Sequence, residues 1–306
     1  MAGETIAVFT KNRTNPAYEA ARLGADRTAA RYGARAAHFV PDQPDDVDQQ
    51  VALVEQAIAQ RPDAVVFVPV HATELDAAVR KLNASGIPVV NYLNRLSSGR
   101  FVTFVGSDDY RLGHGIAEVL FRHLGGTGNV VILEGTPGAV TSRERVRGFL
   151  DAARQSPGIR IAATRAADYQ RETAQRVMRE LLATVPRIDG VLSANDVMSL
   201  GVIDALAAAG RSIPLIGVNA LPEAIEAIKA GTLLATADFD AMKIGCIATE
   251  AAIRHLRGEA VPGEIILPVQ IVDRANYSPW DMPLAARQCP HWSEVVGNWR
   301  PGAPVS

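Results

Sequence analysis

Three segments of the sequence place hydrogen-bonding side chains directly after an apolar run. They are Lys11–Pro16 after Thr5–Phe9, Gly135–Phe149 after Asn129–Leu133, and Asn195–Asp196 after Gly190–Ser193. An apolar strand, a turn and a helix start are how an open α/β sheet presents a ligand site at its carboxyl edge. The side chains are mainly amides and cations, and they form no catalytic constellation. This combination predicts a protein that holds a polar small molecule without reacting with it.

Motifs of enzymes, metal sites and nucleotide sites are missing from the sequence. It contains no His-Glu-x-x-His, no Cys-x-x-Cys and no Gly-x-Ser-x-Gly, and its six histidines lack ligand spacing. Gly125–Gly128 follows a helical pattern, which is the wrong order for a phosphate loop, and Gly135–Gly138 lacks the Lys-Ser/Thr ending. We therefore expect no metal, no cofactor and no catalysis. The enzyme alternative would need Asp196 and Asp238 to face one cleft.

The composition is that of a globular protein with a substantial core. The chain has 306 residues, of which 48% are hydrophobic and 21% charged, a length that suits roughly two domains of about 150 residues. A net charge of -2 without runs of like charge argues against a nucleic-acid surface. No apolar run approaches the roughly 20 residues that a membrane span needs.

Apolar runs alternate with helical patterns along the chain, which predicts an α/β fold with parallel sheets covered by helices on both faces. The expected strands are Thr5–Phe9, Arg35–Phe39, Ala64–Val68, Pro88–Asn91, Phe101–Val105, Asn129–Leu133, Ile159–Ala163, Gly190–Ser193, Pro214–Gly217, Leu234–Thr236 and Ile265–Val272. The expected helices are Pro16–Tyr32, Asp46–Gln60, Thr73–Ser85, Tyr110–Leu124, Ser142–Gln155, Gln170–Thr184, Met198–Ala208, Pro222–Ala230 and Ala241–Arg257.

Five motifs, in this order and spacing, resemble the type I periplasmic solute-binding proteins, in their ribose-binding-like branch. The motifs are Lys11–Tyr18, Gly106–Asp109, Thr141–Phe149, Ala194–Gly201 and Ile216–Asn219. The resemblance covers roughly residues 4–275. It implies two Rossmann-like lobes with parallel sheets, joined by a three-strand hinge near Ser107, Phe239–Asp240 and Leu267–Pro268. The lobes would be 1–106 plus 240–267, and 107–239 plus 268–285, followed by an irregular tail, 286–306.

The resemblance also implies a function. A small polar solute, such as a sugar, polyol or sugar derivative, would bind between the lobes, which close by hinge motion. The protein would be a periplasmic monomer that docks on the permease of an ABC importer. Residues 1–4 form no export signal, so the alternatives are a cytosolic protein and a chain given without its signal, and the resemblance favours the second.

Two other functions share this fold. One is the effector-binding core of a LacI-type regulator, which carries a helix-turn-helix of roughly 60 residues before its first strand, whereas four residues precede Thr5 here. The other is a ligand sensor for a membrane receptor, which would bind its solute in the same way.

The resemblance assigns ligand contacts by motif position. Amides and Arg would pair with the hydroxyls of a polyhydroxylated solute, while aromatic rings cover its C–H surface. The ligand-binding residues that it implies are Lys11, Asn15, Tyr18, Asn94, Arg95, Arg145, Tyr169, Asn195, Asn219, Asp238 and Phe239.

Several of these positions depart from ribose binders. Such proteins carry aspartates at Asn94 and Asn219 and a glutamine at Phe239; they also have an Asn at Val68 and a Phe at Ala17. Because an Asn only partly replaces a carboxylate that accepts two hydroxyls, we expect a solute other than ribose. A polyol, a modified sugar or a sugar with an acid group fits the remaining cations better.

Each predicted contact has a purely structural alternative. Asn15 and Asn195 would simply cap the helices that follow them, and Arg145 would be a solvated residue beside Glu144 or Asp151. Tyr18 and Phe239 would be ordinary core residues.

The two cysteines also leave two alternatives. Cys246 lies in a helical pattern and Cys289 in the tail. They are either one buried thiol and one tail thiol, or a disulfide that pins the tail in an oxidising compartment.

Overall fold

The computed structural model describes residues 3–297 and 299, and these form two compact units. One unit holds the described residues of Met1–Ser107, Asp240–Leu267 and Leu284–Ser306; the other holds Asp108–Phe239 and Pro268–Pro283. The chain therefore passes from one unit to the other four times. The predicted α/β class with two mostly parallel sheets is confirmed.

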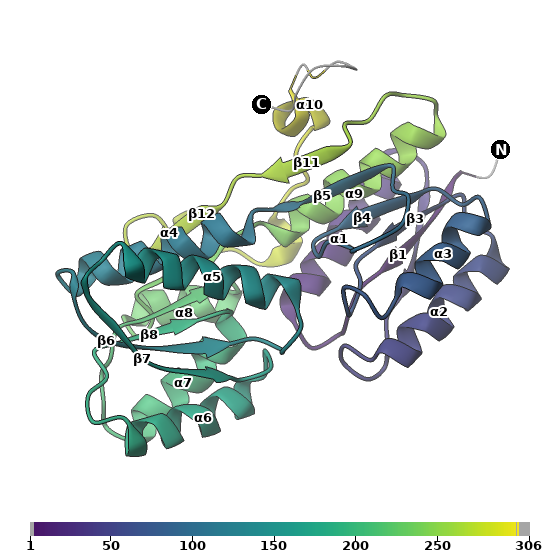
Figure 1. The fold of residues 1–306 in the computed structure, drawn as a ribbon. Helices are drawn as coiled ribbons and strands as arrows, with labels where there is room; N and C mark the ends of the chain where they lie inside the picture. Colours follow the sequence, from purple (N-terminus) through teal and green to yellow (C-terminus); the bar gives the residue numbers. More distant parts are fainter. Residues whose placement is uncertain (1–2, 298, 300–306) are drawn as a thin grey trace. The chain divides into compact units, whose positions relative to one another are not determined.

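The first unit is built on a sheet of six strands in the order β11-β5-β4-β3-β1-β2 (Figure 1). The pairings that link these strands are parallel. The strands are β1 (Thr5–Phe9), β2 (Arg35–Phe39), β3 (Ala64–Phe67), β4 (Val89–Tyr92), β5 (Thr103–Ser107) and β11 (Glu264–Leu267). The helices α1 (Pro16–Arg31) and α9 (Ala241–Leu256) cover one face, and α2 (Val47–Gln60) and α3 (Asp76–Ala84) cover the other.

The core under α2 and α3 explains why β1 and β3 are almost wholly apolar. Phe9 stacks on Phe39 at 4.9 Å between ring centroids and packs against Phe67 at 5.0 Å. Leu75 and Leu82 are fully buried in the same cluster. Strands covered on both faces lose the alternation of polar and apolar residues, so β1 and β3 appear in the sequence as continuous apolar runs.

The second unit repeats the design with the strand order β12-β10-β9-β8-β6-β7. Its strands are β6 (Thr127–Glu134), β7 (Gly158–Ala166), β8 (Gly190–Ser193), β9 (Leu215–Val218), β10 (Ala235–Asp238) and β12 (Gln270–Asp273). Its helices are α4 (Asp109–His123), α5 (Val140–Arg154), α6 (Arg171–Thr184), α7 (Asp196–Ala208) and α8 (Pro222–Ala230). Helices α4 and α5 cover one face of this sheet, and α6 to α8 lie over the other.

The prediction of a single strand over Ile265–Val272 is wrong. β11 pairs with β5 in the first sheet, whereas β12 pairs with β10 in the second and runs antiparallel to it. Pro268 stands between the two strands, and because proline has no N–H to donate it ends the first ladder. One apolar run thus serves two sheets, and β12 makes the second sheet mixed rather than fully parallel.

After β12, the chain folds into short helices before it returns to the first unit. Helix η1 (Ser278–Trp280) belongs to the second unit, and η2 (Leu284–Ala286) and α10 (Trp292–Val296) to the first. The sequence predicts only irregular structure for 286–306, whereas the structure forms the short helix α10 there. The rest of that tail, residues 298 and 300–306, lies outside the described residues.

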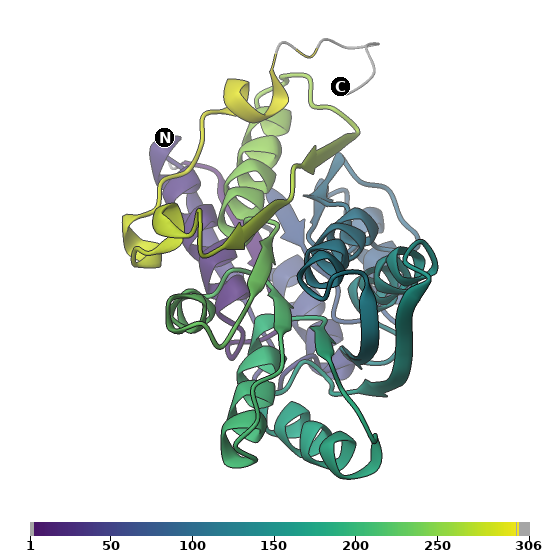
Figure 2. The ribbon, with the colours of Figure 1, turned by 90° about the vertical axis from the view of Figure 1, so that its left-hand side faces the viewer.

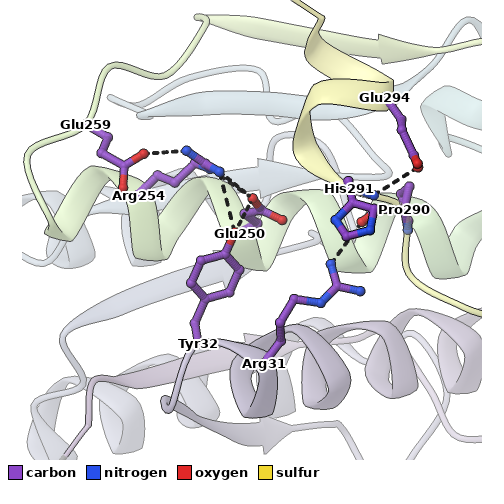
Figure 3. Close-up of polar contacts among 8 residues, drawn as sticks. All are labelled: Arg31, Tyr32, Glu250, Arg254, Glu259, Pro290, His291 and Glu294. Carbon is purple, nitrogen blue, oxygen red and sulfur yellow. Dashed lines mark hydrogen bonds and ion pairs between the residues drawn. The ribbon is translucent and has the colours of Figure 1, made fainter.

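The returning segment is fastened to α1 and α9, beside which it lies in Figure 2. A disulfide joins Cys246 of α9 to Cys289, with 5.8 Å between their Cα atoms. Arg31 donates to the carbonyl of Pro290 at 3.0 Å (Figure 3), and to that of Cys289 at 3.1 Å. Arg254 of α9, which pairs with the buried Glu250, also lies 4.9 Å from the Trp292 ring. Of the two alternatives for the cysteines, the structure therefore forms the disulfide.

Helices α4 and α5 approach each other closely because glycine stands at their contact. A Cβ on Gly113 of α4 would lie 2.3 Å from the carbonyl oxygen of Arg145 on α5. A Cβ on Gly148 of α5 would lie 2.4 Å from the carbonyl oxygen of Tyr110. This approach brings the start of α4 next to the Arg145 side chain.

We expect Gly113→Ala to lower the free energy of unfolding by about 1–3 kcal/mol, because the added methyl overpacks the α4–α5 contact. Gly115→Ala on the same helix is the matched control, since its Cβ would meet no atom within 4 Å. That control should gain up to about 1 kcal/mol of helix propensity. Urea denaturation followed by circular dichroism compares the two, and equal stabilisation by both would contradict the packing argument.

Candidate functional site

The carboxyl ends of β8, β9 and β10 gather three of the predicted ligand residues. Asn195 follows β8, Asn219 follows β9, and Asp238 is the last residue of β10. These strands are neighbours in the sheet, and β8, β9 and β10 run parallel. Because parallel strands end at the same edge, the three side chains start from one margin of the second sheet.

Asn195 is the N-cap of α7, and this role fixes the orientation of its amide. Its Oδ1 accepts a hydrogen bond from Met198 N at 2.9 Å. The residue is 1% exposed, and its Nδ2 has no hydrogen-bond partner among the described residues. Asn195 therefore does cap the helix, as its structural alternative requires, but the cap uses only the amide oxygen. The amide nitrogen is a buried donor whose hydrogen bond is not made within the described residues.

Asn219 has a buried acceptor, whereas Asn195 has a buried donor. Its backbone has a φ of 123°, and its N–H donates to Ala237 O at 2.9 Å. Its side-chain Oδ1 is buried and, within the described part of the chain, accepts no hydrogen bond. A buried carbonyl without a donor costs about 1–3 kcal/mol. Asn195 and Asn219 thus offer one unsatisfied donor and one unsatisfied acceptor.

Arg145 of α5 is buried, not solvated as its structural alternative requires. Its Nε donates to Asp109 Oδ1 at 2.8 Å, and its Nη1 donates to Ala194 O, also at 2.8 Å. The guanidinium carbon lies 5.4 Å from the centre of the Phe239 ring. Burial raises the pKa of the Asp109 carboxyl, and the Arg145 charge opposes that rise. Arg145 therefore braces the residue before Asn195.

Asp238 and Tyr169 flank these groups. The Asp238 Oδ2 accepts a hydrogen bond from Trp280 Nε1 at 2.7 Å. The Tyr169 ring lies over Gly135, where a Cβ would approach it to 2.1 Å, and its hydroxyl is 3.1 Å from Thr141 Oγ1. Burial is the main cause that raises the pKa of Tyr169. Both rings, Tyr169 and Phe239, belong to the second unit.

The predicted residues of the first unit fall into two groups. Lys11 is buried with its Nζ 3.6 Å from Asp45 Oδ1. Asn15 caps α1 by accepting from Ala17 N at 3.0 Å, and Tyr18 is half-buried in the first turn of that helix. These three follow β1 at the carboxyl edge of the first sheet.

Asn94 and Arg95 follow β4 and form the second group. Asn94 is half-buried and accepts at its backbone oxygen from Asn91 Nδ2 at 2.9 Å. Arg95 is half exposed, forms an ion pair with Glu264 and lies 3.9 Å above the Phe104 ring. Arg95 follows β4, which β3 separates from β1 in the sheet, and its guanidinium contacts residues of β5 and β11.

Sequence reasoning missed several residues that hold these groups. Arg22 of α1 donates to Thr10 Oγ1 at 2.8 Å and Asn12 O at 3.2 Å, which fixes the loop after β1. Asp109 holds Arg145, and Trp280 holds Asp238. No pattern in the sequence indicates which residue Trp280 contacts.

Two kinds of feature are absent from residues 3–297 and 299. No cluster of three or more His, Cys, Asp or Glu side chains is placed to hold a metal ion. None of the helices there is both long enough and apolar enough to span a bilayer.

We expect Arg145→Met to lower the free energy of unfolding by about 3–5 kcal/mol near neutral pH, because it leaves the Asp109 carboxylate buried without its cation. The folded-state pKa of Asp109 then rises further above its unfolded value, so the native state takes up a proton more readily. The loss is therefore largest above that folded pKa and shrinks as the pH falls. Urea denaturation at several pH values measures it.

Arg147→Met is the control for this prediction. Arg147 lies on the same helix with a side chain 57% exposed, paired with Glu144. Its removal should change stability by no more than about 0.5 kcal/mol at any pH. A loss at Arg145 that is small or independent of pH would show that Asp109 does not depend on it.

Comparison with known proteins places the chain in a family. Residues 6–260 match the model of the "Periplasmic binding protein domain". The chain is 32% identical over 267 residues to the ribose import binding protein of Bacillus subtilis (strain 168), covering 87% of this chain and 86% of that protein.

Two solved structures have the same fold. An ABC transporter periplasmic solute binding protein from Actinobacillus succinogenes 130z with bound D-allose is 30% identical, with a TM-score of 0.86 over 90% of this chain and 99% of that one. A solute binding protein from Bacillus halodurans C-125 with bound myo-inositol is 27% identical, with a TM-score of 0.85 over 92% and 98%. The chain described here therefore belongs to the periplasmic binding protein domain family, as its ribose-binding-like motifs predict.

Proposed function

We propose that this protein binds a neutral, polyhydroxylated solute and hands it unchanged to the permease of an ABC importer. The observation that carries this proposal is a pair of amide atoms, Asn195 Nδ2 and Asn219 Oδ1, that have no partner in the described part of the chain. They lie at the same sheet edge as the Asp238 carboxylate. A ligand that supplies both an acceptor and a donor would satisfy them.

A hydroxyl group is the simplest chemistry that fits these atoms. Each hydroxyl donates one hydrogen bond and accepts up to two, so neighbouring hydroxyls can accept from Asn195 and donate to Asn219. A ligand lacking one hydroxyl would leave a protein group unpaired, and such sites discriminate strongly for that reason. The rings of Phe239 and Tyr169 offer apolar surface for the C–H face of a sugar or cyclitol.

The charges near the predicted residues favour a neutral solute. Lys11 pairs with Asp45, Arg95 with Glu264, and Arg145 with Asp109. Each of these cations is thus already matched by a carboxylate of its own unit, and Asp238 adds a negative charge at the edge. This arrangement does not favour the sugar acids that the sequence left open, because an acidic ligand would gain little from paired cations.

The relatives support the same class of ligand. One is named for ribose import, and the two solved structures hold D-allose and myo-inositol. The protein with bound D-allose is described as periplasmic, and we propose the same compartment for this chain, with the monomeric state that the motif resemblance implies. By the motif resemblance, Asn94 and Asn219 stand where ribose binders carry aspartates, so we prefer a polyol, a cyclitol or a modified sugar over an aldopentose.

A thermal-shift screen tests the ligand class. D-ribose, D-allose, myo-inositol, xylitol and D-gluconate are the probes, because they separate aldopentose, aldohexose, cyclitol, linear polyol and sugar acid. A solute present at 100 times its Kd adds about 2.7 kcal/mol to native-state stability, which is a rise in Tm of several degrees. We expect at least one neutral probe other than ribose to give this rise, and D-gluconate to give none.

Two outcomes would count against this proposal. If no neutral probe shifts the melting temperature, the solute class is wrong. If D-ribose binds far better than the other neutral probes, the preference drawn from Asn94 and Asn219 is wrong.

We expect Asn195→Asp to weaken binding of the best neutral probe at least about tenfold. The substitution keeps the oxygen that caps α7 but replaces the Nδ2 donor by a second acceptor. Because this carboxylate would be buried, we expect some loss of stability together with the loss of affinity. Isothermal titration calorimetry measures the affinity, and circular dichroism on heating measures the stability.

Asp46→Asn is the matched control, because Asp46 caps α2 by the same contact, accepting from Gln49 N at 2.8 Å. It should leave affinity unchanged. Asn15→Asp makes the corresponding change at the cap of α1 and should weaken binding if Asn15 contacts the solute. Unchanged affinity in Asn195→Asp would show that Asn195 does not contact the solute.

A further inference from the structure

The loop that carries Asn219 is held in an unfavourable backbone conformation. Asn219 and Ala220 both have positive φ, 123° and 50°. The left-handed region costs a residue with a Cβ roughly 1–2 kcal/mol. Such a conformation persists only where surrounding contacts enforce it, so the source of those contacts decides where the Asn219 amide points.

Three successive backbone amides anchor this loop. Asn219 N donates to Ala237 O at 2.9 Å, which is an ordinary backbone contact to β10. Ala220 N donates to Thr236 Oγ1 at 3.2 Å, and Leu221 N donates to Asp196 Oδ2 at 3.0 Å. The second and third anchors are therefore side chains, one from β10 and one from α7.

Asp196 controls both of these side-chain anchors. The Thr236 hydroxyl accepts from Ala220 N and has to donate its own hydrogen elsewhere; it donates to Asp196 Oδ1 at 2.7 Å. The two oxygens of one carboxylate thus hold Leu221 directly and Ala220 through Thr236. Gly217 leaves space for this carboxylate, because a Cβ there would lie 2.1 Å from Oδ1.

From this geometry we infer that Asp196 is a positioning residue for the solute site: its ionised carboxylate holds the 219–221 loop so that Asn219 Oδ1 is presented to the ligand. The inference rests on the proposed function and deepens it. Asp196 is fully buried, and its two oxygens accept from Thr236 and Leu221. In this arrangement it acts on the solute through the loop.

The ionisation state of Asp196 gives the inference a pH dependence. The residue is fully buried, and burial raises the pKa of its carboxyl to about 6, against the hydrogen bonds from Leu221 and Thr236 and the charge of Arg145 on α5. A protonated carboxyl has to donate its hydrogen, whereas the groups that meet Asp196 here, Leu221 N–H and Thr236 O–H, are donors. Protonation therefore loosens the loop, and affinity falls as the pH drops through about 6.

The effect on global stability has the opposite sign. Because the folded-state pKa of Asp196 lies above its unfolded value, its contribution to stability is greatest at low pH and is lost as the pH rises through about 6. A fall in affinity at low pH therefore does not follow from unfolding at this residue. At low pH, a positioning role of Asp196 lowers the affinity, whereas its contribution to global stability is at its greatest. The two measurements therefore separate a positioning role from a merely structural one.

Calorimetric titrations of D-allose, myo-inositol and xylitol at about pH 7.5 and about pH 5, on either side of the titration, test the inference. We expect the wild type to bind its best probe about tenfold more weakly at the lower pH, the equivalent of one lost buried hydrogen bond. Asp196→Asn should bind weakly at both values without this change. Asp204→Asn, on the same helix α7 but paired with Arg171 at the surface, should behave as the wild type.

Variants at Thr236 keep the test decisive if Asp196→Asn fails to fold. Thr236→Val removes the relay hydroxyl at nearly constant volume and should weaken binding, and Thr236→Ser, which keeps the hydroxyl, should restore it. Wild-type affinity in Asp196→Asn with the wild-type pH dependence would overturn the inference, as would wild-type affinity in Thr236→Val.

A readout without ligand separates this inference from the proposed function. Hydrogen-exchange protection factors of the Ala220 and Leu221 amides should fall at the lower pH in the wild type and be low at both values in Asp196→Asn. If none of the three probes binds the wild type, the proposed ligand class fails. The exchange data then still decide whether Asp196 holds the loop, and unchanged protection overturns that claim.

Discussion

A buried polar atom that lacks a partner destabilises a folded protein, and two such atoms stand at the carboxyl edge of the second sheet. Asn195 Nδ2 and Asn219 Oδ1 each forgo a hydrogen bond within the described residues, at a cost of about 1–3 kcal/mol apiece. The cap of α7 requires the Asn195 oxygen and so fixes that amide. We propose that a ligand completes both groups.

The surrounding contacts serve to keep these two atoms in place. Arg145 donates to Ala194 O, one residue before Asn195, and its own charge is balanced by Asp109. Close contact at Gly113 brings Asp109 within reach of Arg145. On the other side of Asn195, the buried Asp196 anchors the strained loop. A binding site whose groups are already oriented loses little entropy when the ligand arrives, and this is the role that we propose for these contacts.

Much of this arrangement was predictable from the sequence. The serial strand and helix patterns predicted the α/β class, and the order of the motifs predicted the family and the strand ends that carry polar residues. Short-range rules also found the cap at Asn195, because Asn before a helix is a local signal. Local signals identify only the capping residue and its helix, so they do not show whether the Asn195 nitrogen also binds a ligand.

The parts that could not be predicted depend on contacts between residues distant in the chain. The run Ile265–Val272 looks like one strand, because nothing local shows that its halves pair with β5 and β10 in different sheets. Arg95 was assigned by motif position, and nothing local indicates that its guanidinium lies on Phe104 and beside Glu264. The Trp280 contact with Asp238 and the Asp196 anchor likewise bring together residues separated by many others. Patterns in one sequence carry no information on such pairings.

The most direct measurement is a crystal structure of the protein with its tightest-binding neutral probe, D-allose, myo-inositol or xylitol. The account predicts ligand hydroxyl oxygens within about 2.7–3.2 Å of both Asn195 Nδ2 and Asn219 Oδ1, with Asn195 Oδ1 still accepting from Met198 N. A complex in which the solute binds while either amide atom remains without a ligand contact would contradict it.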